Sequence, residues 1–394
     1  MSGNIRNNDF GLFVLSQGGS TPPGPTDAVI ILGSGTLSTY RCCVGNISSG
    51  DCSAALSGSN NCATQPYSIV VGGDSNKSLG KSAFVGGGCL NTASGCYDII
   101  LGGNTNCSFN CYNAIFGGFN NIICGCNSVI TNGYQSKVTA TNNFAFISGK
   151  TNCVYGYGLL PQSDYNSVLG KNNCAANQSY GVITNGNLNC SFETSYGIIS
   201  GSSHCLVVGT NNSTTSGSNN YVSCEYSTIH SSCCGCVQTA YSVVQSSKSS
   251  YNTNGAYGDG CYGYNISGCF NCLYSPFSVI SGGCSNETNF TQEVVLSSMS
   301  SRNAGNNSVT ISSEYNYPAL VASGQTTEGI FTASGCCNIN YSNHSIISSG
   351  CYNCMPLIGF AGVIGAGCCN VINCPYYDFI GSGGCNTISC IGCN

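Results

Sequence analysis

The sequence predicts an all-β protein, a parallel β-solenoid with turns of about 15 residues. Three observations lead to this fold class. Glycines recur at a fixed spacing, an asparagine stands three residues after most of them, and a short run of β-branched or aromatic residues precedes each glycine. Such runs, bounded by Gly and Asn, predict short strands, and residues that favour helices are scarce.

The repeat is clearest where the glycines, here called corner glycines, follow one another at intervals of 15 residues. This regular series consists of Gly58, Gly73, Gly88, Gly103, Gly118 and Gly133. The asparagines three residues after a corner glycine include Asn61, Asn76, Asn91, Asn106, Asn121, Asn152, Asn189, Asn220, Asn286, Asn338, Asn353, Asn370 and Asn386. The repeat therefore spans nearly the whole chain.

The third residue before each corner glycine predicts a continuous buried column. Its members are Val70, Val85, Ile100, Ile115, Ile130, Phe146, Ile183, Ile198, Ile229, Val244, Ile280, Val295, Ile347, Ile364 and Ile380. Each unit has room for two strands, such as DIIL followed by NCSF in residues 98–109. Because a single unit cannot bury its own apolar face, successive units must stack about 4.8 Å apart. Roughly 20 such turns predict a rod on the order of 100 Å long.

The fourth residue before the corner glycine is also mostly apolar. This second column comprises Ile69, Phe84, Ile99, Ala114, Val129, Val182, Val243, Val279, Val294, Val363 and Phe379. Neighbouring residues of a strand point to opposite faces, so one of the two columns must lie outside the solenoid. Its exposure along the whole rod predicts that several chains pack side by side. Glycine at the corners supplies positive φ, and stacked asparagines can hydrogen-bond between turns.

Composition excludes several classes of protein. Only 6% of the 394 residues are charged, so the surface must be polar but uncharged, which suits an assembly more than a free enzyme. The net charge of -5 offers no basic field, so nucleic acid is not expected as a partner. No apolar run is long enough for a transmembrane helix, and the N-terminus is a poor secretion signal. We expect cytosolic synthesis without a signal peptide and no membrane insertion.

The chain is expected to contain an attachment or capping segment, residues 1–44, and a solenoid, residues 45–394. The first segment lacks the repeat and contains Pro22, Pro23 and Pro25. The repeat lengthens near 157–164, 251–276 and 317–328, which predicts inserted loops. The second insertion is rich in aromatic residues and is the candidate ligand-contact loop, with Tyr257, Tyr262, Tyr264, Phe270 and Tyr274. The alternative is that this loop packs on its own rod.

The 32 cysteines follow the repeat. Cys96, Cys111 and Cys126 stand seven residues before a corner glycine, whereas Cys62, Cys107, Cys153, Cys190, Cys205 and Cys354 are assigned to the fourth position after one. Stacked turns bring equivalent Cα atoms within the range of a disulfide, so Cys96, Cys111, Cys126, Cys62 and Cys107 are disulfide candidates. The alternative is that cysteine serves as a small, buryable side chain.

No catalytic, cofactor or metal site is predicted. Three C-x-x-C pairs, Cys269–Cys272, Cys351–Cys354 and Cys390–Cys393, arise from the repeat, and the three histidines do not accompany them as a ligand set. Glycoside cleavage needs two converging carboxylates, whereas Asp98 and Asp378 occupy equivalent positions far apart on the rod. Glu287 and Glu293 remain as an alternative pair.

The repeats resemble a known family. SIVVGGDSNKSLG, SAFVGGGCLNTASG and SVISGGCSNET are similar to the head repeats of YadA-like trimeric autotransporter adhesins, and more so to the variant in fibre and appendage proteins of phages and large algal viruses. The resemblance covers about residues 45–394. It implies a left-handed parallel β-roll, three chains around one axis, and a role in surface structure or attachment.

The resemblance leads to a hypothesis about function. We expect a homotrimeric fibre or appendage protein on a virion surface, without a coiled-coil stalk, that acts in attachment. Its expected partners are other copies of itself, other virion or surface proteins bound through the N-terminal segment, and host glycans. The alternatives are a cell-surface or extracellular adhesin or filament subunit and, less favoured, a polysaccharide-degrading spike.

Overall fold

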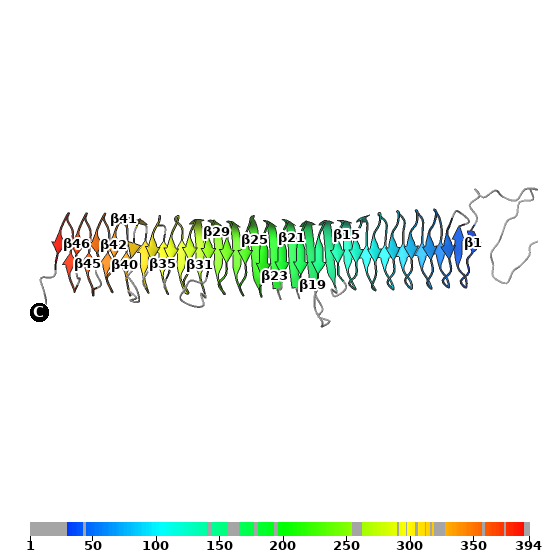
Figure 1. Cartoon of the computed structure of the whole chain (residues 1–394), viewed down its shortest axis with the longest axis horizontal. Coiled ribbons are helices and arrows are strands. Elements are labelled where there is room, and N and C mark those ends of the chain that lie inside the picture. The colour runs from blue at the N-terminus through cyan, green and yellow to red at the C-terminus, as the bar shows by residue number, and fades with distance from the viewer. Residues whose placement is uncertain are drawn as a thin grey trace, which may run out of the picture.

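The computed structural model is a single rod formed by a parallel β-solenoid of about 20 turns (Figure 1). The structure describes residues 30–41, 45–139, 144–155, 165–176, 180–192, 196–253, 262–289, 291–296, 298–303, 306–311, 313–315, 317–318, 328–356, 359–373 and 376–389. These residues contain strands and no helix. The all-β solenoid predicted from the repeat is therefore confirmed.

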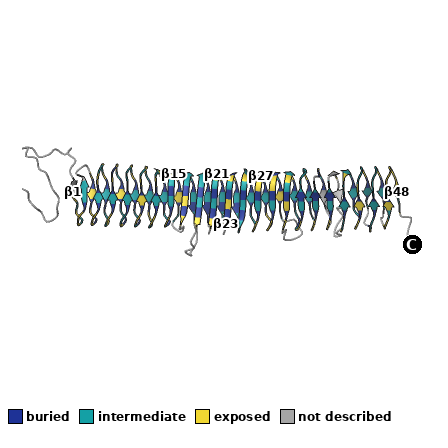
Figure 2. Cartoon of the chain, turned by 180° about the vertical axis from the view of Figure 1, so that it is seen from behind, coloured by how far each residue is buried: buried dark blue, intermediate teal, exposed yellow. Residues whose placement is uncertain are grey.

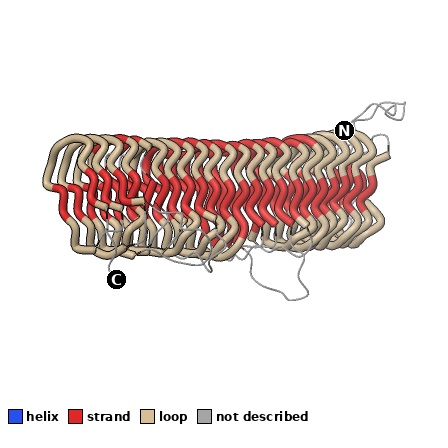
Figure 3. The backbone as a smooth tube through the Cα atoms, turned by 60° about the vertical axis from the view of Figure 1, so that its left-hand side comes forward, coloured by secondary structure: helices blue, strands red, loops and turns tan. Residues whose placement is uncertain are grey.

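Two ladders of strands run along the rod (Figure 3). Their pairings are parallel and in register, apart from shifts after Thr131 and after Val168. The first ladder consists of β2 (Thr39–Arg41), β4 (Ala54–Ala55), β6 (Ile69–Val70), β8 (Phe84–Val85), β10 (Ile99–Ile100), β12 (Ala114–Ile115), β15 (Val129–Tyr134), β17 (Ala145–Lys150), β19 (Tyr165–Lys171), β21 (Tyr180–Asn187), β23 (Tyr196–Ser203), β25 (Asn212–Ser218), β27 (Thr228–Cys233), β29 (Val243–Lys248), β31 (Tyr264–Cys269), β33 (Val279–Ser281), β35 (Val294–Leu296), β37 (Val309–Ile311), β40 (Phe331–Thr332), β43 (Ile346–Ile347), β45 (Val363–Ile364) and β47 (Phe379–Ile380).

The second ladder alternates with the first along the chain. It consists of β3 (Ile47–Ser48), β5 (Cys62–Ala63), β7 (Lys77–Ser78), β9 (Thr92–Ala93), β11 (Cys107–Ser108), β14 (Ile122–Ile123), β16 (Lys137–Val138), β18 (Cys153–Tyr155), β20 (Cys174–Ala176), β22 (Cys190–Phe192), β24 (Leu206–Val208), β26 (Tyr221–Val222), β28 (Cys236–Val237), β30 (Tyr251–Asn252), β32 (Cys272–Leu273), β34 (Glu287–Thr288), β36 (Arg302–Asn303), β39 (Tyr317–Pro318), β42 (Ile339–Asn340), β44 (Cys354–Met355), β46 (Val371–Ile372) and β48 (Thr387–Ile388). One turn of the solenoid, or rung, contributes one strand to each ladder.

Four further strands lie outside these two ladders. The short strands β13 (Gly118–Phe119), β38 (Ser313–Glu314) and β41 (Gly335–Cys336) extend corners of the rungs. At the N-terminal end, β1 (Ile30–Leu32) pairs antiparallel with β2, and β2 pairs parallel with β4. The first ladder thus begins within residues 1–44, the segment that the sequence assigns to attachment or capping. Most of that segment, residues 1–29, lies outside the described residues.

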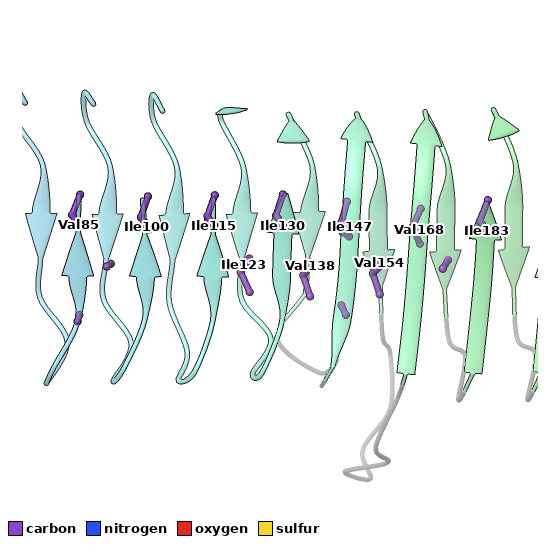
Figure 4. Close-up of a cluster of buried hydrophobic side chains, with 14 of the residues drawn as sticks. Val85, Ile100, Ile115, Ile123, Ile130, Val138, Ile147, Val154, Val168 and Ile183 are labelled. Atoms are coloured by element: carbon purple, nitrogen blue, oxygen red, sulfur yellow. The ribbon is translucent and has the colours of Figure 1, made fainter. Parts of the chain in front are cut away.

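The core is a narrow row of packed apolar side chains between the two ladders (Figure 4). Ile100, Ile115 and Ile130 follow one another on the first ladder, and Ile123 and Val138 follow one another on the second. All five are fully buried. Each two-residue strand of the first ladder turns its second residue inward and its first outward, so only one of the two apolar columns of the sequence pattern is buried.

Two residues assigned to the buried column point outward instead. Phe146 is 40% exposed and Ile198 is 46% exposed, whereas Ile147 and Ile199 are fully buried. At β17 the corner is one residue shorter, because Ile130 pairs with Ile147 while Tyr134 pairs with Lys150. At β23 the residue in the corner-glycine position is Ser202, which pairs with Gly217, and not Gly201. Counting back from the glycine therefore misplaces the inward residue by one at both rungs.

The recurring step from glycine to asparagine has a direct geometric cause. Gly88 has a φ of +88°, and a Cβ built on it would lie 2.0 Å from the carbonyl oxygen of Gly103 on the next rung. Only glycine fits there. Three residues later the chain turns the asparagine side chain into the interior, where it links its own rung to the next.

The buried asparagines form a hydrogen-bonded ladder, as predicted. The Asn91 backbone N–H donates to Oδ1 of Asn76 at 3.0 Å. The Asn91 side-chain Nδ2 donates to the carbonyl oxygens of Gly87 and Gly103, both at 2.9 Å. Oδ1 of Asn91 accepts the backbone N–H of Asn106 at 3.0 Å. A buried amide with all these partners satisfies polar groups that a corner would otherwise leave unpaired.

Candidate functional site

Buried residues recur on the rungs along the whole rod and alternate with exposed ones (Figure 2), so the surfaces considered for function are columns on the outside. One of them, here called the outer strip, comprises the residues on either side of the inward residue of the first ladder. In the N-terminal rungs both positions are apolar: Ile99 is 39% exposed and Leu101 50% exposed, and Phe84 and Phe116 occupy the same two positions on adjoining rungs. The second apolar column of the sequence pattern, which includes Phe84 and Ile99, therefore faces outward, as predicted.

From Thr131 onward the outer strip changes character. The position after the inward residue is now mostly serine or threonine. Thr131 pairs with Ser148, and Thr184 pairs with Ser200. The Thr184 hydroxyl donates to the Ser200 hydroxyl at 3.0 Å. The strip is thus apolar on both sides over the N-terminal rungs and half polar over the middle rungs.

A second exterior feature consists of stacked aromatic rings at the corner that precedes the first ladder. Tyr97 and Tyr112 stack with ring centroids 5.1 Å apart and planes 4° apart. Two longer stacks run through Phe144, Tyr165, Tyr180 and Tyr196, and through Tyr226, Tyr241, Tyr262 and Phe277. The rungs thus bring side chains some 15 residues apart in sequence to the distance at which offset stacking is favourable.

The residues of the candidate ligand-contact loop do not gather at one place. Tyr262 belongs to the aromatic stack, with Tyr241 and Phe277 as its neighbours. Tyr264 begins β31 and Tyr274 follows β32, so they lie on different ladders, and Phe270 lies at the corner between them. Tyr257 lies outside the described residues, as do the insertions near 157–164 and most of 317–328. A role for the loop in ligand contact remains a prediction.

A third feature is the corner ridge, formed by the two outward residues between each corner glycine and the buried position three residues after it. In the N-terminal rungs the ridge carries residues such as Asp74, Asn104 and Asn120. In the C-terminal rungs it becomes rich in sulfur. The ridge residues with sulfur from β27 onward are Cys233, Cys234, Cys269, Cys284, Met299, Cys336, Cys337, Cys351, Cys368, Cys369 and Cys385.

The disulfide candidates occupy two different kinds of position. Cys96, Cys111 and Cys126 stack at one corner on successive rungs, since Tyr112 N–H donates to Cys96 O and Asn127 N–H donates to Cys111 O. Cys62 and Cys107 lie on the outer face of the second ladder, three rungs apart, each between residues other than cysteine. Burial raises the pKa of the Cys62 and Cys107 thiols. The cysteines of the described ranges are free thiols, and disulfide formation remains a prediction.

Cys205 differs from the position assigned to it. It is buried at the place of the ladder asparagine, and its N–H donates to Oδ1 of Asn189 at 3.0 Å. In contrast, Cys153, Cys174 and Cys190 align in register on the outer face of the second ladder. The Cys174 thiol donates a hydrogen bond to the Cys190 sulfur, which lowers the pKa of Cys190 to about 7 and raises that of Cys174.

Three of the carboxylates weighed for catalysis, Asp98, Glu287 and Glu293, lie in different surroundings. Asp98 is buried, and its oxygens accept the N–H groups of Gly95 at 2.9 Å and Asn113 at 3.0 Å. Burial raises the pKa of Asp98 in spite of these bonds. Glu293 is buried in the interior, whereas Glu287 lies on the outer face of β34. Within the described ranges, no group of three or more His, Cys, Asp or Glu side chains is arranged to hold a metal ion.

The sequence interpretation missed the aromatic stacks and the sulfur-rich ridge. Both leave a signal in the sequence, because equivalent residues recur one repeat apart. Examples are Tyr97 and Tyr112, Tyr165 and Tyr180, and Cys336 and Cys351. The sequence pattern assigned cysteines to the fourth position after the corner glycine and the seventh before it, whereas the ridge uses the first two positions after it. The signal is visible once every position of the repeat is aligned, and not only the apolar ones.

Comparison with known proteins adds no family to this description. No protein-family model matches the chain, and a search of curated proteins finds no match. In the part of the chain that the structure describes, no helix has the length and apolar character needed to cross a membrane.

Proposed function

We propose that this chain is a structural subunit of a fibre or appendage on a virion surface, where it acts in attachment. The observation that carries the proposal is the outer strip, a row of apolar side chains facing outward from consecutive in-register rungs. A long rod with such a strip and with 6% charged residues is suited to assembly with copies of itself. The YadA-like repeat pattern favours three copies around one axis.

The energetic argument for assembly is simple. Burial of apolar surface contributes about 25 cal/mol per Å², and the outer strip repeats its apolar residues on every N-terminal rung. Small contributions from each rung add along the rod because the register is constant. The strip therefore supplies a self-complementary surface without any single dominant contact.

Native mass spectrometry of the full chain, with and without reductant, tests the assembly. We expect a trimer under both conditions, because the strip and not a disulfide holds the copies together. The double variant Phe84→Ser, Ile99→Ser is expected to shift the population to monomer. Leu90→Ser, which removes an exposed apolar side chain from the corner ridge, is the matched control and should leave the trimer intact. A monomeric parent chain would refute the proposed assembly.

The proposed location and role need separate tests. Antibodies raised against the rod, used in immunogold electron microscopy of particles purified from cultures that express the gene, should label particle surfaces. Binding to a glycan array is expected if attachment uses host glycans. Release of reducing ends from polysaccharides would instead support an enzymatic spike and contradict a purely structural role.

A further inference from the structure

The strongest unassigned feature is the C-terminal end of the corner ridge, where thiols occupy four consecutive rungs. This C-terminal thiol cluster comprises Cys336, Cys337, Cys351, Cys368, Cys369 and Cys385. Its members are partly or fully exposed. Nothing in the proposed fibre function requires so much sulfur at one solvent-facing corner.

The thiols of the cluster form a continuous path from rung to rung. Cys351 pairs in register with Cys336 on one side and with Cys368 on the other. The path is extended sideways at both ends, since the sulfur atoms of Cys336 and Cys337 lie 3.1 Å apart, and those of Cys368 and Cys369 lie 3.4 Å apart. Cys385 adds a last member, through a side-chain hydrogen bond to Cys369.

The rung spacing decides which chemistry suits this path. In-register side chains on parallel strands point the same way, so their Cβ atoms are separated by about the strand spacing of 4.8 Å. A disulfide needs Cβ atoms about 3.5 to 4.5 Å apart, so bonding Cys351 to Cys336 or Cys368 requires the rungs to close. A cation held linearly between two thiolates separates the sulfurs by about 4.6 Å if its bond to sulfur has the length of a zinc–sulfur bond, about 2.3 Å. Stacked thiols therefore fit a two-coordinate bridge without movement of the backbone.

Two thiols of the cluster have a shifted pKa. The pKa of Cys336 is raised to about 11, chiefly because its hydrogen bond to Cys337 favours the neutral form, and the hydrogen bond with Cys368 raises the pKa of Cys369, so a cation must displace a proton from each. A bound cation removes the repulsion that deprotonation would create. Thiolate sulfur is a soft ligand that selects Cu(I) over hard cations, and no histidine belongs to the cluster.

We propose that the C-terminal thiol cluster binds soft monovalent cations of the Cu(I) type, each bridged by two thiolates that stack on adjoining rungs, such as Cys336 with Cys351 or Cys351 with Cys368. Each binding event joins two thiols to one cation and releases two protons, with no change in oxidation state. A bridge needs only two ligands, so it does not require a preformed group of three. The ridge becomes a linear soft-metal site, distinct from a closed tetrahedral zinc site.

Alkylation mapping of the full-length protein tests the proposal. The protein is reduced, freed of reductant, and titrated anaerobically with Cu(I) in the presence of the competing chelator bicinchoninate. Thiols are then labelled with N-ethylmaleimide and located by peptide mass spectrometry. We expect Cu(I) to protect the C-terminal thiol cluster while Cys62, Cys107 and Cys272, which have no cysteine in register on either side, are labelled as fast as without Cu(I).

The variant Cys351→Ser removes the central link and leaves the rest of the path. It should abolish most of the protection of Cys336 and Cys368, whereas the matched control Cys107→Ser should leave it unchanged. Circular dichroism melting curves of both variants establish that the rod still folds. Equal labelling of the cluster with and without Cu(I), or equal protection of isolated and clustered thiols, would overturn the proposal. Disulfides joining the cluster thiols in protein kept under air, found by non-reducing peptide mapping, would overturn it in favour of a crosslink.

Discussion

The N-terminal rungs, residues 45–123, and the middle rungs, residues 129–248, build the same interior with different corners. In the first region each strand has two residues, and positive φ falls on corner glycines such as Gly88 and Gly103. In the middle region the strands of the first ladder have six to eight residues, and at several corners the positive φ falls on the residue before the corner position, such as Asn185 and Ser231, although Gly149, Gly170 and Gly217 keep it.

The difference teaches that the interior columns, and not the corner, define a rung. Ile100 and Ile183 are both fully buried, and Asn91 and Asn173 make equivalent hydrogen bonds in the two regions. Between these fixed points the chain turns in either of two ways. The corner is therefore free to change length and sequence, while the core and the asparagine ladder are not.

The largest expected effect comes from the core, tested with neighbouring isoleucines in both regions. Ile100→Ala and Ile199→Ala each remove a fully buried side chain, so each should lower the free energy of unfolding by about 2 to 5 kcal/mol. Ile99→Ala and Ile198→Ala remove outward side chains and should cost much less in the isolated rod. Urea unfolding followed by hydrogen exchange of the affected rungs measures this. Equal effects within either pair would contradict the inward and outward assignments.

Removing an asparagine of the ladder should lower the stability by a similar amount in both regions. Asn91→Ala and Asn173→Ala leave buried N–H and carbonyl groups of neighbouring residues without partners, which should lower the free energy of unfolding by about 1 to 3 kcal/mol. We expect a similar loss of stability in the two variants, measured by the same unfolding assay. A much smaller loss at Asn173 would mean that the longer strands of the middle region compensate for the ladder.

Substitutions at the corners should affect stability differently in the two regions. Gly88→Ala places a Cβ 2.0 Å from a backbone oxygen at positive φ, so it should destabilise the rod by about 1 to 3 kcal/mol. Ser231→Ala changes a residue that already has a Cβ at positive φ, and should have an effect within about 0.5 kcal/mol. Thermal unfolding of both variants measures the contrast, and similar melting temperatures would remove the distinction between the two corner types.

Asp98 allows a pH test within the regular region. Its pKa is raised above the ordinary value of 3.8 by burial, so the folded state prefers the protonated form. The parent chain should therefore lose stability as the pH rises from below 3.8 through the folded pKa. Asp98→Asn places in this rung the residue that Asn113 and Asn166 supply in others, and should be the more stable protein at neutral pH. Parallel stability curves for both chains between pH 3 and pH 8 would contradict this.

The smallest expected effect is in the aromatic stacks of the middle region. Tyr180→Ala breaks its stacking with Tyr165 and Tyr196 and should cost about 0.5 to 1.5 kcal/mol. Tyr67→Ala removes an exposed tyrosine whose column neighbours are Cys52 and Ser82, and should be close to neutral. Near-ultraviolet circular dichroism should change only for Tyr180→Ala. Identical spectra and stabilities would show that the stack contributes nothing.

Much of the fold could be predicted because single residues at fixed positions mark each repeat. The corner glycine and the asparagine are each required by local geometry, so Gly88 and Asn91 are recognisable without a structure. Prediction failed where a rung changed length, as at Phe146 and Ile198, because a shift of one residue reverses which side chain points inward. Most features of the outer surface could not be predicted from the apolar pattern.

The sequence by itself determined the solenoid, its repeat, the buried column in the regular rungs and the asparagine ladder. These depend on interactions that recur at the same position of every turn. Only the tertiary structure decided which residues meet where rungs differ in length: the stacking of Phe144 on Tyr165, and the alignment of Cys351 with Cys368. The physical reason is that such contacts join residues about one turn apart, and insertions of variable length set which residues come into register.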